Sequence, residues 1–531
     1  MKLCIIKMPN KSEEAIMPDL GTGMLVSILK NEGFYVSQVD LKPVQREQHP
    51  LHNDYHNISP LEAKYFLEHS KSEKISSITK KIVSKFKLDK YDMLGFSLDE
   101  GTIIGVNLAI IKEIKNQIDC CVILGGTFDF SKRHIKKFQF IDFIIKGDAT
   151  YSLSKLLEEM EKPNPNLNKV PGLIYRENKE IKSNKYFRQM GNTELVPDFS
   201  DLNMEDYKLT PKEVMGDYYH LIKEQLPQKK TAILPFHFIK GCPNSCNFCF
   251  WNREKYFKCT KPEEVSNLLI HMKKRYKINN FFFLNNSFNP TVKYGEKLVN
   301  SFISNDVGIN WSDSINPRNT HQKMIEKAGQ SGCRLLYWGI ESASKRVLKL
   351  LNKNNPEKSS LFENYLKKAH ESNIFNGINF FLGIPYEKKE DILKTKEFIK
   401  RTHKYFEFYN ANLLWLFPEF PLINNPSAHN IRLRKIGSIE QRNPSENHYI
   451  KKTLDEVGIN KKIKFYSFDE LEGLNWEKKN KQDINHCNII LNTLDKKKKE
   501  FFDNIHRTFY LSTVFQDKKE ILNLFENIKK K

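Results

Sequence analysis

Short apolar runs alternate with amphipathic stretches along the first 160 residues. The short runs predict buried strands, and the longer stretches, such as GTGMLVSILKNEG, predict helices. This alternation is typical of a parallel sheet covered by helices. We therefore predict an α/β, doubly wound, Rossmann-like (flavodoxin-like) domain over residues 1–160, with its ligand crevice at the carboxyl ends of the strands. The predicted elements are strands at Leu3–Ile6, Tyr35–Val39, Met93–Phe96, Cys121–Leu124 and Phe143–Ile145, and a helix at Tyr151–Met160.

The chain changes character over residues 161–230, where Pro163, Pro165 and Pro171 interrupt the pattern. The segment GLIYRENKEI predicts a small hairpin, because two short runs flank a turn-forming stretch. We interpret residues 161–230 as a connector.

Alternation returns over residues 231–430, where apolar runs are separated by helical segments. This pattern predicts a partial (β/α)6 barrel of the TIM type, in which the chemistry takes place at the carboxyl ends of the strands. Beyond residue 430 the pattern weakens into lysine-rich segments, so residues 431–531 are predicted to be mainly helical. The predicted barrel strands lie in ILPFHFI, FFFLN, INWSDS, RLLYWGIES, NGINFFLGIP and ANLLWLFPEF.

The charge balance of the chain is strongly positive, with 85 Lys and Arg against 64 Asp and Glu, a net charge of +21. Such a balance suits a polyanion such as RNA. The lysines are nevertheless scattered along helical faces instead of gathering in one patch, and Lys and Asn are used heavily throughout. We therefore expect nucleic acid to be an unlikely partner.

Nine cysteines are too few for a disulfide scaffold, and three of them crowd into eight positions. This favours metal chemistry in a reducing compartment. The amino terminus, MKLCIIKMPN, lacks the apolar core of a signal peptide, and no stretch approaches the ~18 apolar residues of a membrane span. We expect a cytoplasmic protein without a membrane segment.

The three clustered cysteines are Cys242, Cys246 and Cys249 in GCPNSCNFC, directly after the strand-like run HFIK. Three thiolates on one loop can hold three corners of a 4Fe-4S cluster and leave the fourth iron open for a small ligand. A zinc site is the alternative, but zinc usually takes a fourth Cys or His at matching spacing. Cys259 and His237 lie nearby without that spacing.

The segment CPNSCNFC resembles the C-x-x-x-C-x-aromatic-C motif of the radical S-adenosylmethionine (SAM) superfamily. The resemblance implies that Cys242, Cys246 and Cys249 hold a 4Fe-4S cluster whose open iron binds SAM. One-electron reduction then yields a 5′-deoxyadenosyl radical. By the same resemblance Phe248 lies near the adenine.

Further elements resemble the same superfamily at successive strand ends. FFFLNNSFNP resembles its second-strand motif, although Asn285 and Asn286 stand where acidic residues are common. YWGIES resembles the fourth-strand element, and GIPY with PEFPL the fifth and sixth. The resemblance makes four further residues candidates for binding SAM: Asn285, Arg318, Glu341 and Gly383. No catalytic acid or base is identified.

The first 160 residues resemble the cobalamin-binding domains that precede the barrel in a large subgroup of radical SAM enzymes. MPDLGTGMLVSILKNEGF, LGFSLDEG, VILGGT and IIKGDATYSLSKLL carry the resemblance. Small residues there let the backbone approach a large flat ligand, although tight turns alone would also explain them. No D-x-H-x-x-G motif follows the first strand, so no histidine ligand to cobalt is expected. The candidate cobalamin-binding residues are Gly21, Gly23, Ser97, Gly101, Gly125, Gly126, Thr127 and Gly147.

The resemblance implies a class B-like radical SAM methyltransferase that uses methylcobalamin to methylate an unactivated carbon of a peptide or natural-product intermediate. A second hypothesis is cobalamin-associated cyclisation, rearrangement or oxidation without methyl transfer. A third is a tRNA methylthiotransferase, which would need a further cysteine trio in the first domain, where only Cys4, Cys120 and Cys121 occur. The expected partners are a peptide or small-molecule substrate and an external electron donor of the flavodoxin or ferredoxin type.

Overall fold

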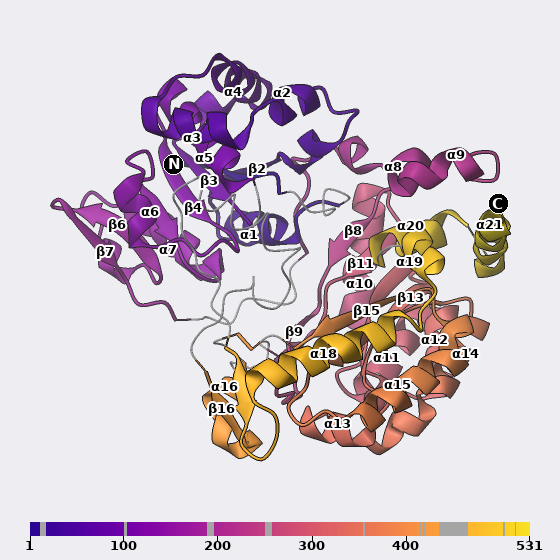
Figure 1. Ribbon diagram of the computed structural model, residues 1–531. Helices are drawn as coiled ribbons and strands as arrows, with labels where there is room; N and C mark the ends of the chain where they lie inside the picture. The colour runs from indigo at the N-terminus through magenta and orange to yellow at the C-terminus, as the bar shows by residue number, and fades with distance from the viewer. Residues whose placement is uncertain are drawn as a thin grey trace. The chain divides into compact units, whose positions relative to one another are not determined.

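The computed structural model describes residues 1–531 except 11–16, 100–102, 188–195, 250–256, 354–355, 415, 418–419, 435–465, 503–504, 516 and 531. The described residues form two compact units (Figure 1). The N-terminal unit comprises Met1–Lys208, and the barrel unit begins at Leu209. The division into residues 1–160, 161–230, 231–430 and 431–531 stays a prediction.

The sheet of the N-terminal unit has the strand order β2-β1-β3-β4-β5-β6-β7. Strands β1 to β5 are parallel, and their order is that of flavodoxin-like doubly wound sheets, which confirms the predicted fold. The hairpin expected in GLIYRENKEI forms β6 and β7, which extend this sheet in antiparallel fashion. The strands are β1 (Lys2–Lys7), β2 (Tyr35–Asp40), β3 (Met93–Ser97), β4 (Cys121–Gly125), β5 (Phe143–Ile145), β6 (Leu173–Glu177) and β7 (Glu180–Ser183).

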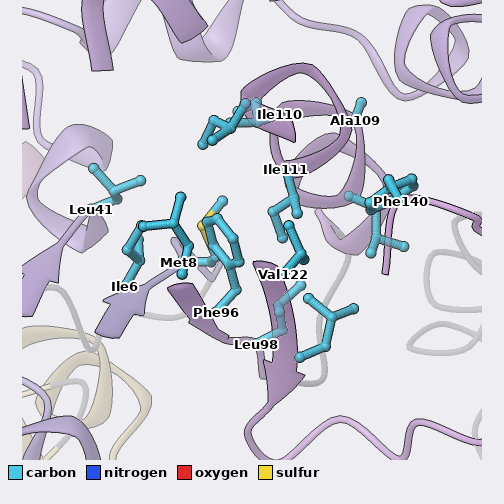
Figure 2. Close-up of a cluster of buried hydrophobic side chains, with 14 of the residues drawn as sticks. Ile6, Met8, Leu41, Phe96, Leu98, Ala109, Ile110, Ile111, Val122 and Phe140 are labelled. Atoms are coloured by element: carbon cyan, nitrogen blue, oxygen red, sulfur yellow. The ribbon is translucent and has the colours of Figure 1, made fainter. Parts of the chain in front are cut away.

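Helices cover both faces of this sheet because its central strands are apolar on both sides. One apolar cluster joins β1, β3 and β4 to α5, with Ile6, Phe96 and Ile110 among its members (Figure 2). A second cluster joins the opposite face to α1 and α7. The helices are α1 (Leu20–Asn31), α2 (His52–His56), α3 (Pro60–His69), α4 (Glu73–Phe86), α5 (Ile104–Gln117), α6 (Lys132–Lys137) and α7 (Ala149–Met160).

The barrel unit contains a six-stranded parallel sheet in the order β8-β11-β12-β13-β14-β15. Each strand pairs with the next in this series, as the predicted partial barrel requires, so the predicted fold is confirmed. Two short antiparallel pairs, β9 with β10 and β16 with β17, accompany it. The strands are β8 (Leu234–Phe236), β9 (Ile239–Gly241), β10 (Phe257–Cys259), β11 (Asn280–Phe283), β12 (Asn310–Ile315), β13 (Cys333–Glu341), β14 (Phe375–Leu382), β15 (Phe408–Leu413), β16 (Ile431–Leu433) and β17 (Phe468–Glu470).

Helices α10, α11, α12, α14 and α15 pack against one another in that order, and α18 packs beside α15 (Figure 1). The region after residue 430 is mainly helical where it is described, as predicted. Within the described ranges, no helix is long and apolar enough to cross a membrane. The helices are α8 (Pro211–Met215), α9 (Tyr219–Ile222), α10 (Pro262–Tyr276), α11 (Val292–Ser304), α12 (Gln322–Gln330), α13 (Lys345–Leu350), α14 (Phe362–Glu371), α15 (Lys389–Thr402), α16 (Pro421–Asn424), α18 (Trp476–Leu491), α19 (Lys496–Phe502), α20 (Ile505–Val514) and α21 (Lys518–Lys530).

Candidate iron-sulfur and cofactor sites

The cysteine loop follows a turn that sequence reasoning did not foresee. The first barrel strand, β8, ends at Phe236, and β9 then pairs with β10 before the loop begins at Cys242. The Asn285 Oδ1 atom, at the end of β11, accepts hydrogen bonds from the backbone N–H groups of Phe238 and Ile239, both at 3.0 Å. Asn285 thereby fixes the turn that carries the thiols beyond the carboxyl end of β8.

Hydrogen bonds hold the cysteine loop against the end of α13. The Asn247 backbone N–H donates to the Leu351 carbonyl at 3.1 Å, and its Nδ2 donates to the Leu350 carbonyl at 3.0 Å. The Asn352 Nδ2 donates to the Ser245 carbonyl at 2.8 Å. The loop is therefore positioned by several backbone contacts even without a bound group.

None of the three thiols is in a disulfide, and Cys246 is the most buried of them. Burial raises the pKa of the Cys246 thiol, and the positive charges of Lys353 and Arg318 oppose this rise. Nearby cations favour the thiolate form that iron requires. Three thiols outside any disulfide, on one positioned loop with two cations near Cys246, fit a 4Fe-4S cluster.

Glu341 lies at the carboxyl end of β13, where the register with β14 shifts and its φ is 64°. This left-handed conformation is strained for a non-glycine residue. Its buried carboxylate accepts from Lys353 Nζ at 2.9 Å and from Asn379 Nδ2 at 2.7 Å. The backbone strain and the two contacts together orient the carboxylate.

Arg318 is also buried, at 2% exposure, in the 3-10 turn after β12. Both of its terminal nitrogens donate to the Gly339 carbonyl at 3.3 Å. Burial lowers the pKa of the guanidinium, and the charges of Glu341 and Cys246 oppose this fall. Arg318, Glu341 and Cys246 are therefore electrostatic neighbours, and Lys353 joins them through Glu341 and Cys246.

Lys353 was missed by the sequence analysis, although it follows the GIES element in the segment VLKLLNK. Its ammonium also lies 4.9 Å from the centre of the Phe248 ring, which packs against Phe381 with ring centres 4.7 Å apart. The same lysine thus contacts the ring next to Cys249 and the carboxylate of Glu341. A lone lysine after a helix carries no sequence signal that separates it from a surface residue.

A row of polar side chains next to Glu341 was also missed. Asn379 Oδ1 accepts from Tyr337 OH at 3.2 Å and from Asn412 Nδ2 at 2.9 Å, and Asn410 Nδ2 donates to Tyr337 OH at 2.9 Å. Asn410 and Asn412 are exposed and lie on one face of β15, because side chains two residues apart share a face. This row provides exposed amides beside the candidate SAM-binding residues.

Asn285 and Gly383 have contacts that bear on their candidate roles. Asn285 Nδ2 donates to Asp313 Oδ2 at 2.7 Å, so both ends of its amide contact the protein. Burial raises the pKa of the Asp313 carboxyl well above its ordinary value, against the opposing hydrogen bond from Asn285. Gly383 has a φ of 75° at the end of β14, and its N–H donates to Glu387 Oε2 at 2.8 Å.

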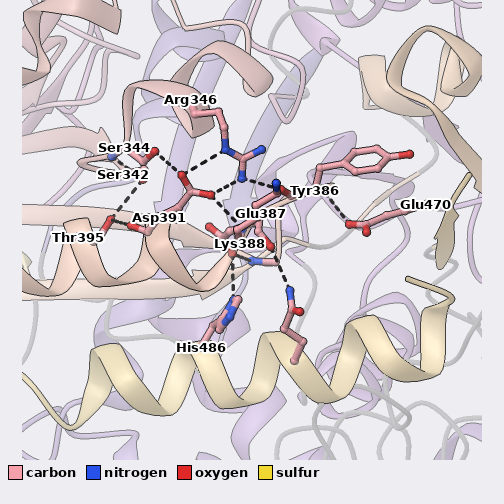
Figure 3. A network of polar contacts seen from close by, with 12 residues as sticks. Ser342, Ser344, Arg346, Tyr386, Glu387, Lys388, Asp391, Thr395, Glu470 and His486 are labelled. Atoms are coloured by element: carbon pink, nitrogen blue, oxygen red, sulfur yellow. Dashed lines mark hydrogen bonds and ion pairs between the residues drawn. The ribbon is translucent and has the colours of Figure 1, made fainter. Parts of the chain in front are cut away.

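The loop after β14 belongs to a polar network that joins several elements (Figure 3). Arg346 forms a salt bridge with Asp391 and donates to the Tyr386 carbonyl at 2.6 Å, while Ser344 Oγ donates to Asp391 at 2.6 Å. Burial raises the pKa of Asp391, but hydrogen bonds from Arg346 and Ser344 outweigh it, and the net pKa is lowered. This network fixes the backbone beside Gly383. Pro418 and Glu419 of the motif PEFPL lie outside the described residues.

In the N-terminal unit, four of the candidate cobalamin-binding residues meet at the carboxyl ends of adjacent strands. Ser97 ends β3 and is in register with Gly125 at the end of β4, with Gly126 and Thr127 next in the chain. Gly125 has room for a Cβ atom, whereas Gly126 has a φ of 108° and a Cβ there would lie 2.2 Å from the Leu98 carbonyl oxygen. The backbone conformation requires glycine at position 126.

The other candidate glycines lie elsewhere around this edge. Gly23, in α1, faces the ring of Phe199, and Gly147, after β5, has a φ of 82° and faces the ring of Tyr186. Gly21 is exposed in the first turn of α1. Gly101 lies outside the described residues.

A charged cluster at the same edge was not predicted. Lys7, the last residue of β1, lies 3.2 Å from Asp19 and 2.6 Å from Asp99, and Thr127 Oγ1 donates to Asp99 Oδ1 at 3.0 Å. Burial lowers the pKa of Lys7, but the two carboxylates outweigh it, and the net pKa is raised. Asp19 also faces the buried Lys42, so among the described residues two bases and three acids, with Asp40, meet at this edge.

Residues 236–399 match the family model described as the radical SAM superfamily. The chain contains a radical SAM domain. Such a domain implies a 4Fe-4S cluster and SAM as cofactors, and its matched range includes the cysteine loop, Arg318, Glu341 and Gly383.

An uncharacterized methyltransferase of Pyrococcus horikoshii is 24% identical to this chain over 330 residues. The match covers 60% of this chain and 66% of the relative, so the chain spans just under two thirds of that relative's length.

Two solved structures resemble the chain along most of its length. One is the radical SAM methyltransferase TsrM of Kitasatospora setae with cobalamin and a [4Fe-4S] cluster bound, at 14% identity and a TM-score of 0.58, covering 93% of this chain and 90% of TsrM. The other is the cobalamin-dependent radical SAM enzyme OxsB with aqua-cobalamin and SAM bound, at 12% identity and a TM-score of 0.58, covering 99% and 75%. At these identities the likeness establishes the fold.

Proposed function

We propose that this protein is a cobalamin-dependent radical SAM methyltransferase that methylates an unactivated carbon of a peptide or natural-product intermediate. The observation that carries the proposal is the presence, in one chain, of a 2-1-3-4-5 parallel sheet with small residues at its carboxyl edge and a radical SAM domain with a three-cysteine loop. The likeness in fold to TsrM and OxsB supports the combination.

When bound, a 4Fe-4S cluster would supply the electron that cleaves SAM to methionine and a 5′-deoxyadenosyl radical, and cobalamin would carry the methyl group. Cys242, Cys246 and Cys249 would hold the cluster. Lys353 and Arg318 add positive charge that stabilises thiolates in a partly buried loop.

The other candidate residues would each contact a different part of SAM. Arg318 is proposed to bind the methionyl carboxylate and Glu341 the ribose or the amino group. Phe248 and the backbone at Gly383 would lie near the adenine. Asn285 remains a candidate contact, although the structure shows its amide holding the turn before the cysteine loop.

In the N-terminal unit the chain offers cobalamin mostly backbone and small side chains. Ser97, Gly125, Gly126 and Thr127 lie together at the edge where doubly wound sheets bind their ligands. Gly21, Gly23, Gly101 and Gly147 complete the proposed set. No histidine is assigned to the cobalt.

The proposal is tested by anaerobic reconstitution of the full-length protein, followed by quantification of iron, sulfide and cobalt. About four irons per chain and one bound corrinoid are expected, with 5′-deoxyadenosine formed from SAM and dithionite. Four irons with no retained cobalamin would contradict methyl transfer through cobalamin while leaving the radical chemistry intact.

Transfer of the methyl group is tested separately with SAM that carries a trideuterated methyl group. A peptide or metabolite product that gains the labelled methyl supports the proposal. An unlabelled product that has lost hydrogen or rearranged would instead support cyclisation or oxidation. Reduction by a flavodoxin or ferredoxin in place of dithionite would identify the class of electron donor.

A further inference from the structure

A second group of metal-ligating side chains lies away from the cysteines, between the loop after β14 and helix α18. Glu387 on that loop and Asp483 and His486 on α18 are all buried, and each offers one ligand atom within 4.8 Å of the others. Asp483 and His486 share a face of α18, because residues three apart on a helix are neighbours. Figure 3 shows His486 on the helix pointing toward Glu387.

The ring nitrogen Nδ1 of His486 gives the evidence for a bound ligand. His486 is 4% exposed, and its Nδ1 atom has no hydrogen-bond partner among the described residues. This nitrogen lies 3.8 Å from Glu387 Oε2, which is too long for a hydrogen bond. A buried ring nitrogen without a partner is costly, and a metal ion between the two atoms would satisfy it.

The formal charges around this group are unbalanced. Glu387, Glu470 and Asp483 are buried acids, and Lys479 is the buried base beside them, 2.7 Å from Asp483 and 4.0 Å from Glu470. Among the described residues, these contacts place one ammonium beside three carboxylates. A divalent cation would add positive charge in a place where water cannot.

We propose that Glu387, Asp483 and His486 bind a divalent transition-metal ion such as Zn²⁺. One imidazole with two carboxylates suits zinc better than Mg²⁺, which takes oxygen ligands almost exclusively. Side-chain movements on the order of 1 Å would bring the three ligand atoms to zinc distances. The ion would fasten α18 to the loop that carries Gly383, because Glu387 also accepts the Gly383 N–H.

The binding test uses full-length protein in which Cys242, Cys246 and Cys249 are all changed to alanine, so that the cysteine loop cannot take up zinc. This background also makes the result independent of the proposed radical chemistry. After removal of metals with a chelator, the protein is titrated with ZnCl₂, and bound zinc and the thermal midpoint are measured. One zinc per chain and a raised midpoint are expected, with no response to MgCl₂. Absence of stoichiometric zinc would overturn the proposal.

Two variants of that protein test whether zinc binds to His486 or to the neighbouring thiol. His486→Gln should weaken zinc binding by at least about tenfold. Loss of a residue that only hydrogen-bonds to a metal ligand already costs about tenfold or more in affinity, and loss of the ligand itself should cost at least as much. Cys487→Ser, at the neighbouring position, should leave zinc affinity unchanged. A fall in affinity with Cys487→Ser alone would assign the zinc to a thiol and refute the site.

Lys479→Met keeps the proposal testable if His486→Gln does not fold. The ammonium of Lys479 competes with a metal for Asp483, so its removal should tighten zinc binding by about tenfold or more. Zinc should also raise the thermal midpoint of this variant more than that of the parent. If Lys479→Met is destabilised and zinc has no effect on it, the buried group is an ion-pair network and not a metal site.

Discussion

The two parallel sheets of this protein have opposite charge excesses at their carboxyl edges. At the ends of β1 and β2, the described bases Lys7 and Lys42 face three acids, Asp19, Asp40 and Asp99. In the barrel unit, two bases, Arg318 and Lys353, are neighbours of one acid, Glu341. The same α/β layout therefore provides two different environments for a ligand.

The charge at each carboxyl edge agrees with the side chains that the edge offers to a ligand. In the barrel unit the excess positive charge lies near the Cys246 thiol, whose ionised form it stabilises. In the N-terminal unit the edge offers Ser97, Thr127 and glycine backbone. These groups would contact a ligand through close packing and hydrogen bonds. One edge is thus suited to an anionic cluster, and the other to a large ligand that contacts backbone and small side chains.

The largest effect is expected from the thiols. Cys246→Ala should abolish cluster retention and the formation of 5′-deoxyadenosine, because three thiolates are needed to hold the cluster. Iron quantification and product chromatography measure both. Cys487→Ser, which removes a thiol on α18, is the matched control and should keep both. Normal iron content in Cys246→Ala would show that the loop does not carry the cluster.

The positive charge of the barrel edge is tested next with Lys353→Met. This variant leaves Glu341 buried without its ion-pair partner, which costs about 3–5 kcal/mol, and should slow SAM cleavage at least about tenfold. Lys349→Met, on the exposed side of α13, is the control and should be nearly neutral.

A double variant distinguishes binding from folding at this edge. Lys353→Met combined with Glu341→Gln should recover part of the lost stability, because position 341 no longer carries an unpaired buried charge, while Arg318 loses its acidic neighbour. SAM cleavage should stay low. If cleavage recovers together with stability, the pair is structural and does not bind SAM.

The backbone of the other edge is tested with Gly126→Ala. A methyl group there would meet the Leu98 backbone at 2.2 Å in a left-handed conformation, so a loss of about 2–4 kcal/mol and lower cobalamin retention are expected. Gly33 has a similar φ, 89°, but a Cβ atom there would have no heavy atom within 4 Å. Gly33→Ala should therefore lower the free energy of unfolding by only about 1–2 kcal/mol. Thermal unfolding of the full chain and cobalt content measure the two effects; equal losses in both variants would mean that strain alone requires glycine at 126.

The last prediction concerns the opposite, amino-terminal edge of the barrel sheet. The buried Lys518 lies 3.0 Å from Glu407 and donates to the Ile374 carbonyl at 2.7 Å, and burial lowers its pKa to about 8. Between pH 8 and the ordinary pKa of lysine the unfolded chain binds more protons than the folded one, so stability should rise with pH, by up to about 3 kcal/mol. Denaturant titrations across this range measure the slope. Lys518→Met should abolish it, and an unchanged slope would assign it to another group.

Much of the fold could be predicted because its signals are local. Most strands of the two parallel sheets were placed to within a few residues from apolar runs and the breaks between them, but β15 begins before the predicted run ANLLWLFPEF and ends well inside it. The hairpin of β6 and β7 was also visible, but its addition to the edge of the first sheet was not, since strand pairing depends on distant residues. The turn before the cysteine loop was missed because the run HFIK continues the apolar pattern of β8.

The sequence by itself determined the two α/β sheets, the three-thiol loop and the order of the motifs at successive strand ends. Spacing along the chain carries that information, because three cysteines in one short loop must lie close together. Only the tertiary structure decided that Lys353 meets Glu341, that Asn285 holds the turn before the thiols, and that His486 reaches Glu387 from a helix about a hundred residues later. Such contacts depend on how separate elements pack, and the chemical identity of one side chain does not reveal which distant partner it will meet.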